Sequence, residues 1–191
     1  MILDHFVGVN KLVSQPLSIF KFNIILMKGQ DALFSSDFHG YSTPSELFEW
    51  VNKRFNFTVD VCADKSNHKC SKYYTEESNG LLQSWRDEVA WCNPPYNRTK
   101  LWILKGISEI KNNDCETIVY LIPARVETKL WQEVIAPFAD KIIFLKGRLK
   151  FSGNKNSAPF PSALVIFTQP WNDTYKTKVE FLDYKTGDII E

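Results

Sequence analysis

A short apolar segment that ends at two consecutive prolines constrains the fold of this chain more than any other feature. Residues 89–92 are Val, Ala, Trp and Cys, and Asn93, Pro94, Pro95 and Tyr96 follow them. Proline lacks a backbone N–H and has a fixed φ, so a strand in this segment must end there and the chain must turn outward. The sequence therefore predicts a rigid loop at the carboxyl end of a buried strand, which is where open α/β sheets bind ligands.

This loop carries groups that could hold an aromatic amine. The side-chain oxygen of Asn93 and the carbonyl oxygen of Pro94 are two acceptors for an –NH2 group, and Tyr96 offers a ring for stacking. Two acceptors on the amine hydrogens would localise the nitrogen lone pair, mainly in the transition state. The alternative is a plain turn, because Asn-Pro and Pro-Pro are common turn dipeptides. The four residues alone leave both interpretations open.

Helices and strands alternate from residue 43 to residue 138, and strands dominate afterwards. Apolar residues with helical spacing predict helices from Thr43 and over residues 98–112 and 130–138. One strand is predicted to begin at Phe55 and to end near Asp60, and others are predicted over residues 72–74, 89–92, 117–122, 142–145 and 163–167. This order predicts an α/β three-layer sandwich, with a mostly parallel sheet and an antiparallel strand pair at its C-terminal end.

The 191 residues suit one domain with tails. The domain is expected over residues 35–168, after an N-terminal extension (1–34) and before a tail (169–191) that includes a hairpin over residues 181–190. The apolar stretch 17–27 is interrupted by polar residues and is too short to span a membrane. Residues 1–26 also lack the features of a signal peptide, so the natural start is expected at Met27.

Charge and cysteine content narrow the possible functions. The net charge is +1, so any contact with a nucleic acid would need a local basic patch. Cys62, His68 and Cys70 lie close together, but their spacing matches no usual zinc pattern. Buried free thiols in a reducing cytosol are the preferred interpretation, and no metal is expected.

The helix start at residues 43–46 has two interpretations. Thr43 is predicted to cap the helix, Pro44 to take its first position and Glu46 to complete a capping box. The N–H groups of such a helix start can also bind a carboxylate. Thr43 and Pro44 are therefore candidate ligand contacts as well as candidate caps.

Acidic residues follow two of the predicted strands. Asp60 ends the first strand, and Glu76 and Glu77 follow the second. An acid at the first position could hold amine or hydroxyl groups of a cofactor, and an acid after the second strand commonly binds a ribose diol. A turn-capping Asp60 and a solvated acidic pair are the simpler alternatives.

Basic residues follow several predicted strands. Arg98 and Lys100 follow the proline loop, Arg125 follows the strand that ends at residue 122, and Arg148 and Lys150 follow the next strand. If they share one edge of the sheet, they form a rim that could contact phosphates. Surface lysines often serve only solubility, so Arg125 and Arg148 are the preferred candidates.

Taken in order, these motifs resemble those of the phage-type DNA N-6-adenine methyltransferases. The resemblance covers about residues 36–167 and lowers the weight of the plain-turn alternative, because seven motifs in one order are specific although each is weak alone. The motifs are Ser42-Thr43-Pro44, residues 59–63, Asn79-Gly80-Leu81 with Trp85, residues 91–96, residues 121–125, residues 147–151 and residues 158–163.

The resemblance implies a Rossmann-like methyltransferase that uses S-adenosylmethionine to methylate adenine in double-stranded DNA. Asn93, Pro94, Pro95 and Tyr96 would form the catalytic motif, and the target adenine would be flipped out and stacked on Tyr96. A phage or prophage protein acting as a monomer in the cytoplasm of a bacterial host, away from membranes, is expected. The implied cofactor contacts are Thr43, Pro44, Asp60, Ala63, Glu76 or Glu77, and Asn79.

Two features depart from related methyltransferases. Most carry a glycine-rich loop after the first strand, whereas the eight glycines here include no G-x-G; the phage-type proteins look similar at this loop, which indicates a family variant. The segment from Asp60 to Asn93 is also too short for a separate target-recognition domain. Alternatives are methylation of another planar amine or amide, such as an RNA base or a protein glutamine, or a non-catalytic nucleic-acid-binding module of the same fold.

Overall fold

The computed structural model describes residues 42–152, 155–171 and 176–190. The chain divides into two compact units, Met1–Phe38 and His39–Glu191. The second unit is described below. The expected extension over residues 1–34 and the expected start at Met27 lie outside the described residues.

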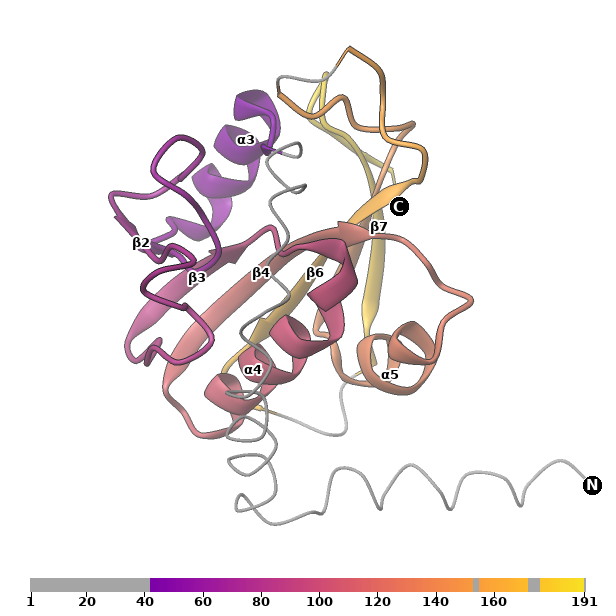
Figure 1. The fold of residues 1–191 in the computed structure, drawn as a ribbon. Helices are drawn as coiled ribbons and strands as arrows, with labels where there is room; N and C mark the ends of the chain where they lie inside the picture. Colours follow the sequence, from indigo (N-terminus) through magenta and orange to yellow (C-terminus); the bar gives the residue numbers. More distant parts are fainter. Residues whose placement is uncertain (1–41, 153–154, 172–175, 191) are drawn as a thin grey trace, which may run out of the picture. The chain divides into compact units, whose positions relative to one another are not determined.

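In the described part of the chain, eight strands form a sheet in the order β2-β1-β3-β4-β6-β5-β7-β8 (Figure 1). Strands β1, β2, β3 and β4 pair in parallel, as do β5 and β7, whereas β6 is antiparallel to both β4 and β5 and β8 is antiparallel to β7. The predicted α/β fold with a mostly parallel sheet is confirmed. The strands are β1 (Val59–Asp60), β2 (Lys72–Tyr73), β3 (Glu88–Cys92), β4 (Cys115–Pro123), β5 (Lys141–Leu145), β6 (Ser162–Thr168), β7 (Lys178–Asp183) and β8 (Asp188–Ile190).

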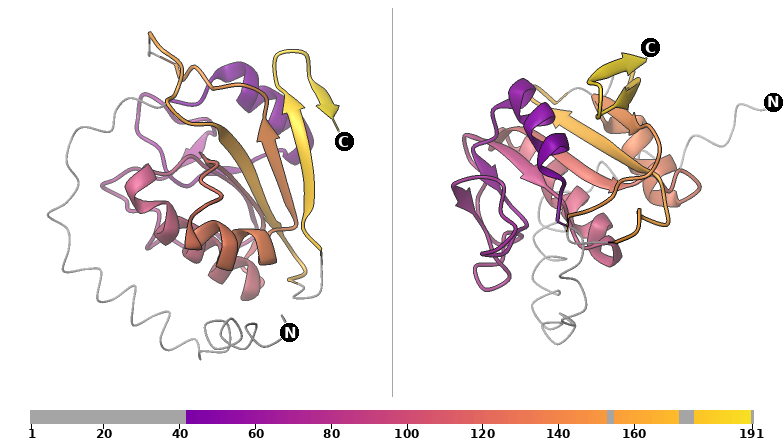
Figure 2. Two further views of the ribbon diagram at one scale, coloured as in Figure 1. Left: turned by 90° about the vertical axis from the view of Figure 1, so that its right-hand side faces the viewer. Right: turned by 90° about the horizontal axis from the view of Figure 1, so that it is seen from above.

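The alternating side chains of strand β4 pack against helices on both faces of the sheet. Ile118, Tyr120 and Ile122 pack into one apolar cluster, together with α4 (Thr99–Lys111). Val119 and Leu121, which alternate with them, pack into a second cluster with α3 (Ser45–Phe55). Figure 2 shows α3 on one face, and α4 and α5 (Ala136–Phe138) on the other. A strand buried on both faces requires the continuous apolar run that predicted it.

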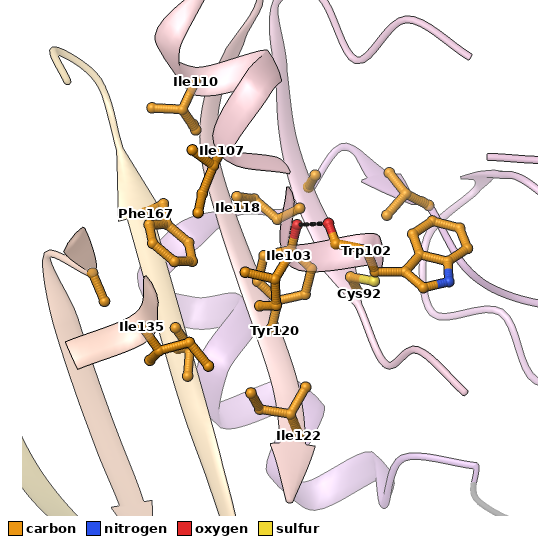
Figure 3. Close-up of a cluster of buried hydrophobic side chains, with 14 of the residues drawn as sticks. Cys92, Trp102, Ile103, Ile107, Ile110, Ile118, Tyr120, Ile122, Ile135 and Phe167 are labelled. Atoms are coloured by element: carbon orange, nitrogen blue, oxygen red, sulfur yellow. Dashed lines mark hydrogen bonds between the residues drawn. The ribbon is translucent and has the colours of Figure 1, made fainter. Parts of the chain in front are cut away.

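A buried contact fixes helix α4 against β4 (Figure 3). The hydroxyl of the fully buried Tyr120 donates to the carbonyl oxygen of Trp102 at 2.7 Å. An ideal Cβ at Gly106 would lie 1.9 Å from that hydroxyl, so only glycine allows this close approach. Because α4 begins directly after the proline loop, this contact also positions the C-terminal side of the loop.

The start of α3 differs from the prediction. The helix begins at Ser45, and Pro44 occupies the N-cap position with ψ of 134°, without a side-chain cap hydrogen bond. The prediction that Thr43 caps the helix within a capping box is therefore wrong. The physical reason is a tertiary contact, because the hydroxyl of Thr43 accepts a hydrogen bond from Asn93.

One other boundary was also predicted incorrectly. Helix α3 continues to Phe55 and ends at Asn56, which has a left-handed φ of 54°, so β1 is much shorter than the strand predicted from residue 55. The helix predicted over residues 130–138 is present and ends at Phe138, but its residues 131–135 form a π-helical turn, η5 (Trp131–Ile135), before the short α5. Pro137 lacks the N–H that a regular helix would bond to the carbonyl of Glu133, which accounts for the irregularity.

The last two strands form a hairpin and extend the sheet. Strand β7 pairs with β8 across a turn that contains Gly187, whose φ is 83°. Strand β7 also pairs in parallel with β5, so the hairpin is joined to the main sheet. Within the described residues, the structure has no helix with the length and apolarity needed to cross a membrane.

Candidate active site

The carboxyl ends of four strands meet at one edge of the sheet. Strands β1, β3 and β4 are parallel, and β5 has the same direction because β4 and β5 are both antiparallel to β6. The segments that follow these strands carry Asp60 to Ala63, Asn93 to Arg98, Arg125 and Arg148. The predicted site residues of these segments therefore gather at the edge where such sheets bind ligands.

The proline loop is held at both ends. It leaves β3 at Cys92, and the buried Pro94 follows directly after Asn93. A 3₁₀ turn, η4 (Tyr96–Arg98), leads into α4. The N–H of Arg98 donates to the carbonyl of Pro95 at 2.9 Å, and the hydroxyl of Thr99 donates to the carbonyl of Tyr96 at 3.0 Å. The loop is thus a short bridge between a buried strand and a fixed helix.

The side chain of Asn93 is anchored by a residue 50 positions earlier in the chain. Its Nδ2 donates a hydrogen bond to Oγ1 of Thr43 at 3.2 Å. Thr43 is 2% exposed and Asn93 is half-buried, so this contact is partly shielded from solvent. The structure therefore joins two of the predicted motifs, Thr43-Pro44 and the Asn93 loop.

Tyr96 is half-buried and packs against two aromatic rings. The ring of Phe160 lies 5.0 Å away, between centroids, at an interplanar angle of 89°, and the ring of the buried Phe151 lies 6.5 Å away at 59°. Edge-to-face contacts of this kind hold a ring in place. Neither of these two rings takes the parallel stacking geometry that a bound base would use. Phe151 and Phe160 were not predicted as site residues, although both belong to motifs of the resemblance.

Asp60 lies at the end of β1, beside Trp91 of β3 in the sheet register. It is only 3% exposed, and its two carboxylate oxygens accept the backbone N–H groups of Cys62 at 3.3 Å and Lys69 at 3.0 Å. Burial raises the pKa of this carboxyl from 3.8 to about 6, although the two N–H donors oppose the increase. Asp60 thus organises the loop after β1, and its charge is sensitive to mildly acidic pH.

We expect the free energy of unfolding to depend on pH through Asp60. Between pH 3.8 and about 6, the folded protein keeps a proton that the unfolded chain releases. The stabilisation is therefore complete below this range, and about 3 kcal/mol is lost as the pH rises through it. Urea unfolding across this range should show the decrease in the wild type, and Asp60→Asn, which cannot ionise, should flatten it. Equal slopes for the two proteins would contradict the assignment.

The remaining predicted cofactor contacts belong to the part of the chain that connects β1 to β3. The N–H of Ala63 donates to the carbonyl of Tyr74 at 3.0 Å, which ties the loop after β1 to the segment after β2. Asn79 has a φ of 49°, and its N–H donates to the carbonyl of Thr75 at 2.9 Å. Glu76 and Glu77 lie in the same turn with exposed side chains. Backbone hydrogen bonds therefore fix Ala63 and Asn79, whereas the carboxylates of Glu76 and Glu77 remain accessible to solvent.

Gly80 has a structural role that the sequence alone did not indicate. It is buried, and an ideal Cβ at this position would lie 2.0 Å from the carbonyl oxygen of Val61. Its own carbonyl accepts a hydrogen bond from the indole N–H of Trp85 at 3.0 Å. Gly80 therefore lets the turn of residues 75–80 pack directly on the backbone that precedes Cys62 and Ala63.

The predicted basic residues are mostly exposed at the same edge. Lys100, Arg125, Arg148 and Lys150 are exposed, and Arg98 is half-buried. Arg125 pairs with Glu127 at 3.2 Å, and Arg148 donates to the carbonyl of Pro159 at 2.9 Å. Arg148 therefore also braces the segment that carries Phe160.

Metal ligands do not gather in the part of the chain that the structure describes. Across residues 42–152, 155–171 and 176–190, no group of three or more His, Cys, Asp or Glu side chains could hold a metal ion. The ring of His68 instead stacks on Tyr73 with centroids 4.1 Å apart, and its Nδ1 lies 3.0 Å from the carbonyl oxygen of Cys70.

The regions of this chain that match known proteins include all the segments at this edge of the sheet. A family model described as DNA N-6-adenine-methyltransferase (Dam) matches residues 33–186. The DNA N-6-adenine-methyltransferase of Haemophilus phage HP1 is 29% identical over 140 residues, which are 69% of this chain and 80% of that protein. The protein of the same name from Escherichia phage T1 is 31% identical over 111 residues, which are 57% of this chain and 45% of that protein.

The family match includes the helix start at Thr43, the proline loop and the strands that frame them. Its description favours DNA adenine over the RNA-base and protein-glutamine alternatives. The chain belongs to the DNA N-6-adenine-methyltransferase (Dam) family.

Proposed function

We propose that this DNA adenine-N6 methyltransferase takes its methyl group from S-adenosylmethionine and holds the target amine between Asn93 and Pro94. The observation that carries the proposal is the anchoring of the Asn93 amide on the buried Thr43, at the end of β3. A plain turn needs no such anchor for its side-chain amide. A fixed acceptor on a rigid loop is what recognition of an amine requires.

The residues at this edge fit the chemistry of S-adenosylmethionine. The start of α3, beside Thr43 and Pro44, offers N–H groups for the carboxylate of the methionine portion. Asp60 and the backbone of Ala63 would lie beside the methionine and adenosine portions, and Glu76 or Glu77, with Asn79 in the same turn, would hold the ribose hydroxyls. When bound, the cofactor supplies an electrophilic methyl group on a sulfonium.

The protein side of the reaction is activation of a weak nucleophile. The lone pair of the adenine amine is delocalised into the ring, so the free amine reacts poorly. Acceptance of its two hydrogens by Oδ1 of Asn93 and the carbonyl of Pro94 would favour a pyramidal nitrogen and localise the lone pair. The N–C bond would form as the bond between the methyl carbon and the sulfonium sulfur breaks, which leaves a neutral thioether. N6 then carries the positive charge and loses a proton to water, so no side-chain base is required.

The base must leave the duplex to reach this loop. We infer that the adenine is flipped out and stacks on Tyr96, whose ring is held edge-on by Phe160. Arg98, Lys100, Arg125, Arg148 and Lys150 would contact the phosphates around the extruded nucleotide. Pro95 would keep the loop rigid. The enzyme would work as a monomer in the cytoplasm of a bacterial host.

Mass spectrometry of nucleosides tests this proposal. The protein is incubated with S-adenosylmethionine and unmethylated double-stranded DNA, and the digest should contain N6-methyldeoxyadenosine. Parallel reactions with RNA and with protein, using radioactive cofactor, should remain unlabelled. Label found only in RNA or protein would overturn the proposal, and the absence of cofactor binding in calorimetry would favour a non-catalytic module.

A further inference from the structure

We propose that Val126 acts as a wedge: its side chain enters the duplex where the target adenine leaves and thereby favours the extruded base. The inference rests on the proposed flipping of adenine into the proline loop. It assigns a role to residues 124–129, the β4 loop, in which only Arg125 was a candidate site residue.

The β4 loop stands beyond the proline loop because β4 is the longer of two neighbouring strands. In their register, Cys92, the last residue of β3, pairs with Tyr120. Strand β4 continues over Leu121, Ile122 and Pro123, which adds about 10 Å at the rise of a β-strand. A duplex that delivers a base to the proline loop therefore also meets the β4 loop.

Hydrogen bonds hold the β4 loop in a defined conformation. The carbonyl of Arg125 accepts both the N–H and the hydroxyl of Thr128, at 3.0 and 2.8 Å. The carbonyl of Val126 itself accepts a hydrogen bond from Nε2 of Gln132 at 3.3 Å. A wedge needs such support, because a side chain on a yielding loop would be displaced before the bases part.

Val126 presents an apolar side chain at this edge of the sheet. It is 51% exposed, although valine is usually buried. Among the described residues, the other exposed large apolar residues are Leu82, Val179 and Phe181. Single exposed apolar residues are common on protein surfaces, so exposure alone assigns no role. Val126 differs by its place on a fixed loop beside the residues that would receive the base.

The charged neighbours of Val126 suit a duplex rather than an apolar partner. Arg125 and Lys129 are exposed on the same loop. The charge of Glu127 is balanced by Arg125, whose Nε lies 3.2 Å from its carboxylate. Lys129 then leaves the β4 loop with a net positive charge, which favours the phosphates beside the bases.

Extrusion of a base costs the stacking and pairing that the base had in the duplex. An apolar side chain that enters the gap offsets part of this cost. Burial of the exposed half of the Val126 side chain would favour the extruded state about fivefold. The benefit should be greatest on fully paired DNA and should shrink where the target adenine is already mispaired.

The test measures kcat/KM for two duplexes that contain the methylated site, which is first mapped on genomic DNA. In one duplex the target adenine faces thymine, and in the other it faces cytosine. Val126→Ser should lower kcat/KM about fivefold on the paired duplex and less than about twofold on the mismatched one. Val126→Leu, which keeps an apolar side chain, should retain the activity of the wild type on both duplexes.

Val179→Ser is the matched control. Val179 is 52% exposed, but it lies at the start of β7, toward the opposite edge of the sheet. Its replacement should leave kcat/KM unchanged on both duplexes. Thermal unfolding should give similar Tm values for both serine variants and the wild type, since both side chains are half exposed.

Two results would overturn the inference. Equal losses of Val126→Ser on the paired and mismatched duplexes would mean that Val126 serves the loop and not the extrusion of the base. Unchanged activity of Val126→Ser on the paired duplex would mean that no wedge acts there. The wild type tests the proposed function separately: if it methylates adenine in neither duplex, that function fails and this inference fails with it.

Discussion

Replacement of Asn93 by alanine is expected to lower methyl transfer to DNA about a thousandfold, because the proposed acceptor for the target amine is lost. The effect should fall on kcat, since the acceptor acts mainly in the transition state. The fold should tolerate the change, because Asn93 lies on a loop and is only half-buried. Transfer of a radioactive methyl group to DNA measures the loss, and calorimetry should show nearly unchanged binding of S-adenosylmethionine.

Asn93→Asp is the matched control for this prediction. It keeps an acceptor oxygen in nearly the same place, but it replaces the Nδ2 donor to Thr43 with a second acceptor oxygen and adds a negative charge. Its activity should therefore be intermediate, at least about tenfold above that of the alanine variant. Activity of Asn93→Ala within a few-fold of the wild type would rule out the proposed mechanism.

Gly80→Ala is expected to have the largest effect on stability. The added Cβ would lie 2.0 Å from the main-chain carbonyl oxygen of Val61 and 3.1 Å from the indole ring of Trp102. A backbone atom cannot move aside as a flexible side chain can. We expect a loss of about 3 kcal/mol, or roughly 10 °C in Tm. The displaced Val61 should also disturb Cys62 and Ala63, so the affinity for S-adenosylmethionine should weaken in calorimetry.

Gly147→Ala separates this steric effect from the loss of a glycine in general. Gly147 has a φ of 74°, but an added Cβ there has no neighbour within 4 Å. Its replacement should cost only the strain of the left-handed conformation, about 1 kcal/mol, and leave the loop after β1 in place. Thermal unfolding of both variants tests the difference. A Gly80→Ala protein as stable as Gly147→Ala would disprove close packing of the 75–80 turn on Val61.

Most of the sheet could be predicted because its central strands are buried on both faces. The runs at residues 117–122 and 163–167 contain almost only apolar residues, and both became strands of the sheet, β4 and β6. The two prolines after Asn93 ended β3 as predicted, because proline cannot continue a strand ladder. These features are local consequences of covalent structure and side-chain polarity.

The errors arose where a contact from a distant segment decided the local structure. Thr43 has the side chain of a helix cap, but its hydroxyl contacts Asn93 in the folded protein. Phe55 has the β propensity of a strand residue, yet it packs partly buried at the end of α3. Local propensities are small compared with such tertiary contacts and are overridden by them.

The sequence by itself determined that an amide, two prolines and an aromatic ring follow a buried strand, because the order of residues along the chain cannot change on folding. Only the tertiary structure decided what surrounds them. Strand β6 lies between β4 and β5 and is antiparallel to both, so the segment that precedes it lies at the same edge of the sheet as the proline loop. This segment contains Phe160, which packs against Tyr96. Thr43 and Asn93 are 50 positions apart in the chain. They meet because α3, which follows Thr43, packs on the sheet that contains β3, the strand before Asn93. Such contacts depend on how strands pair and layers stack, and no pattern of neighbouring residues encodes them.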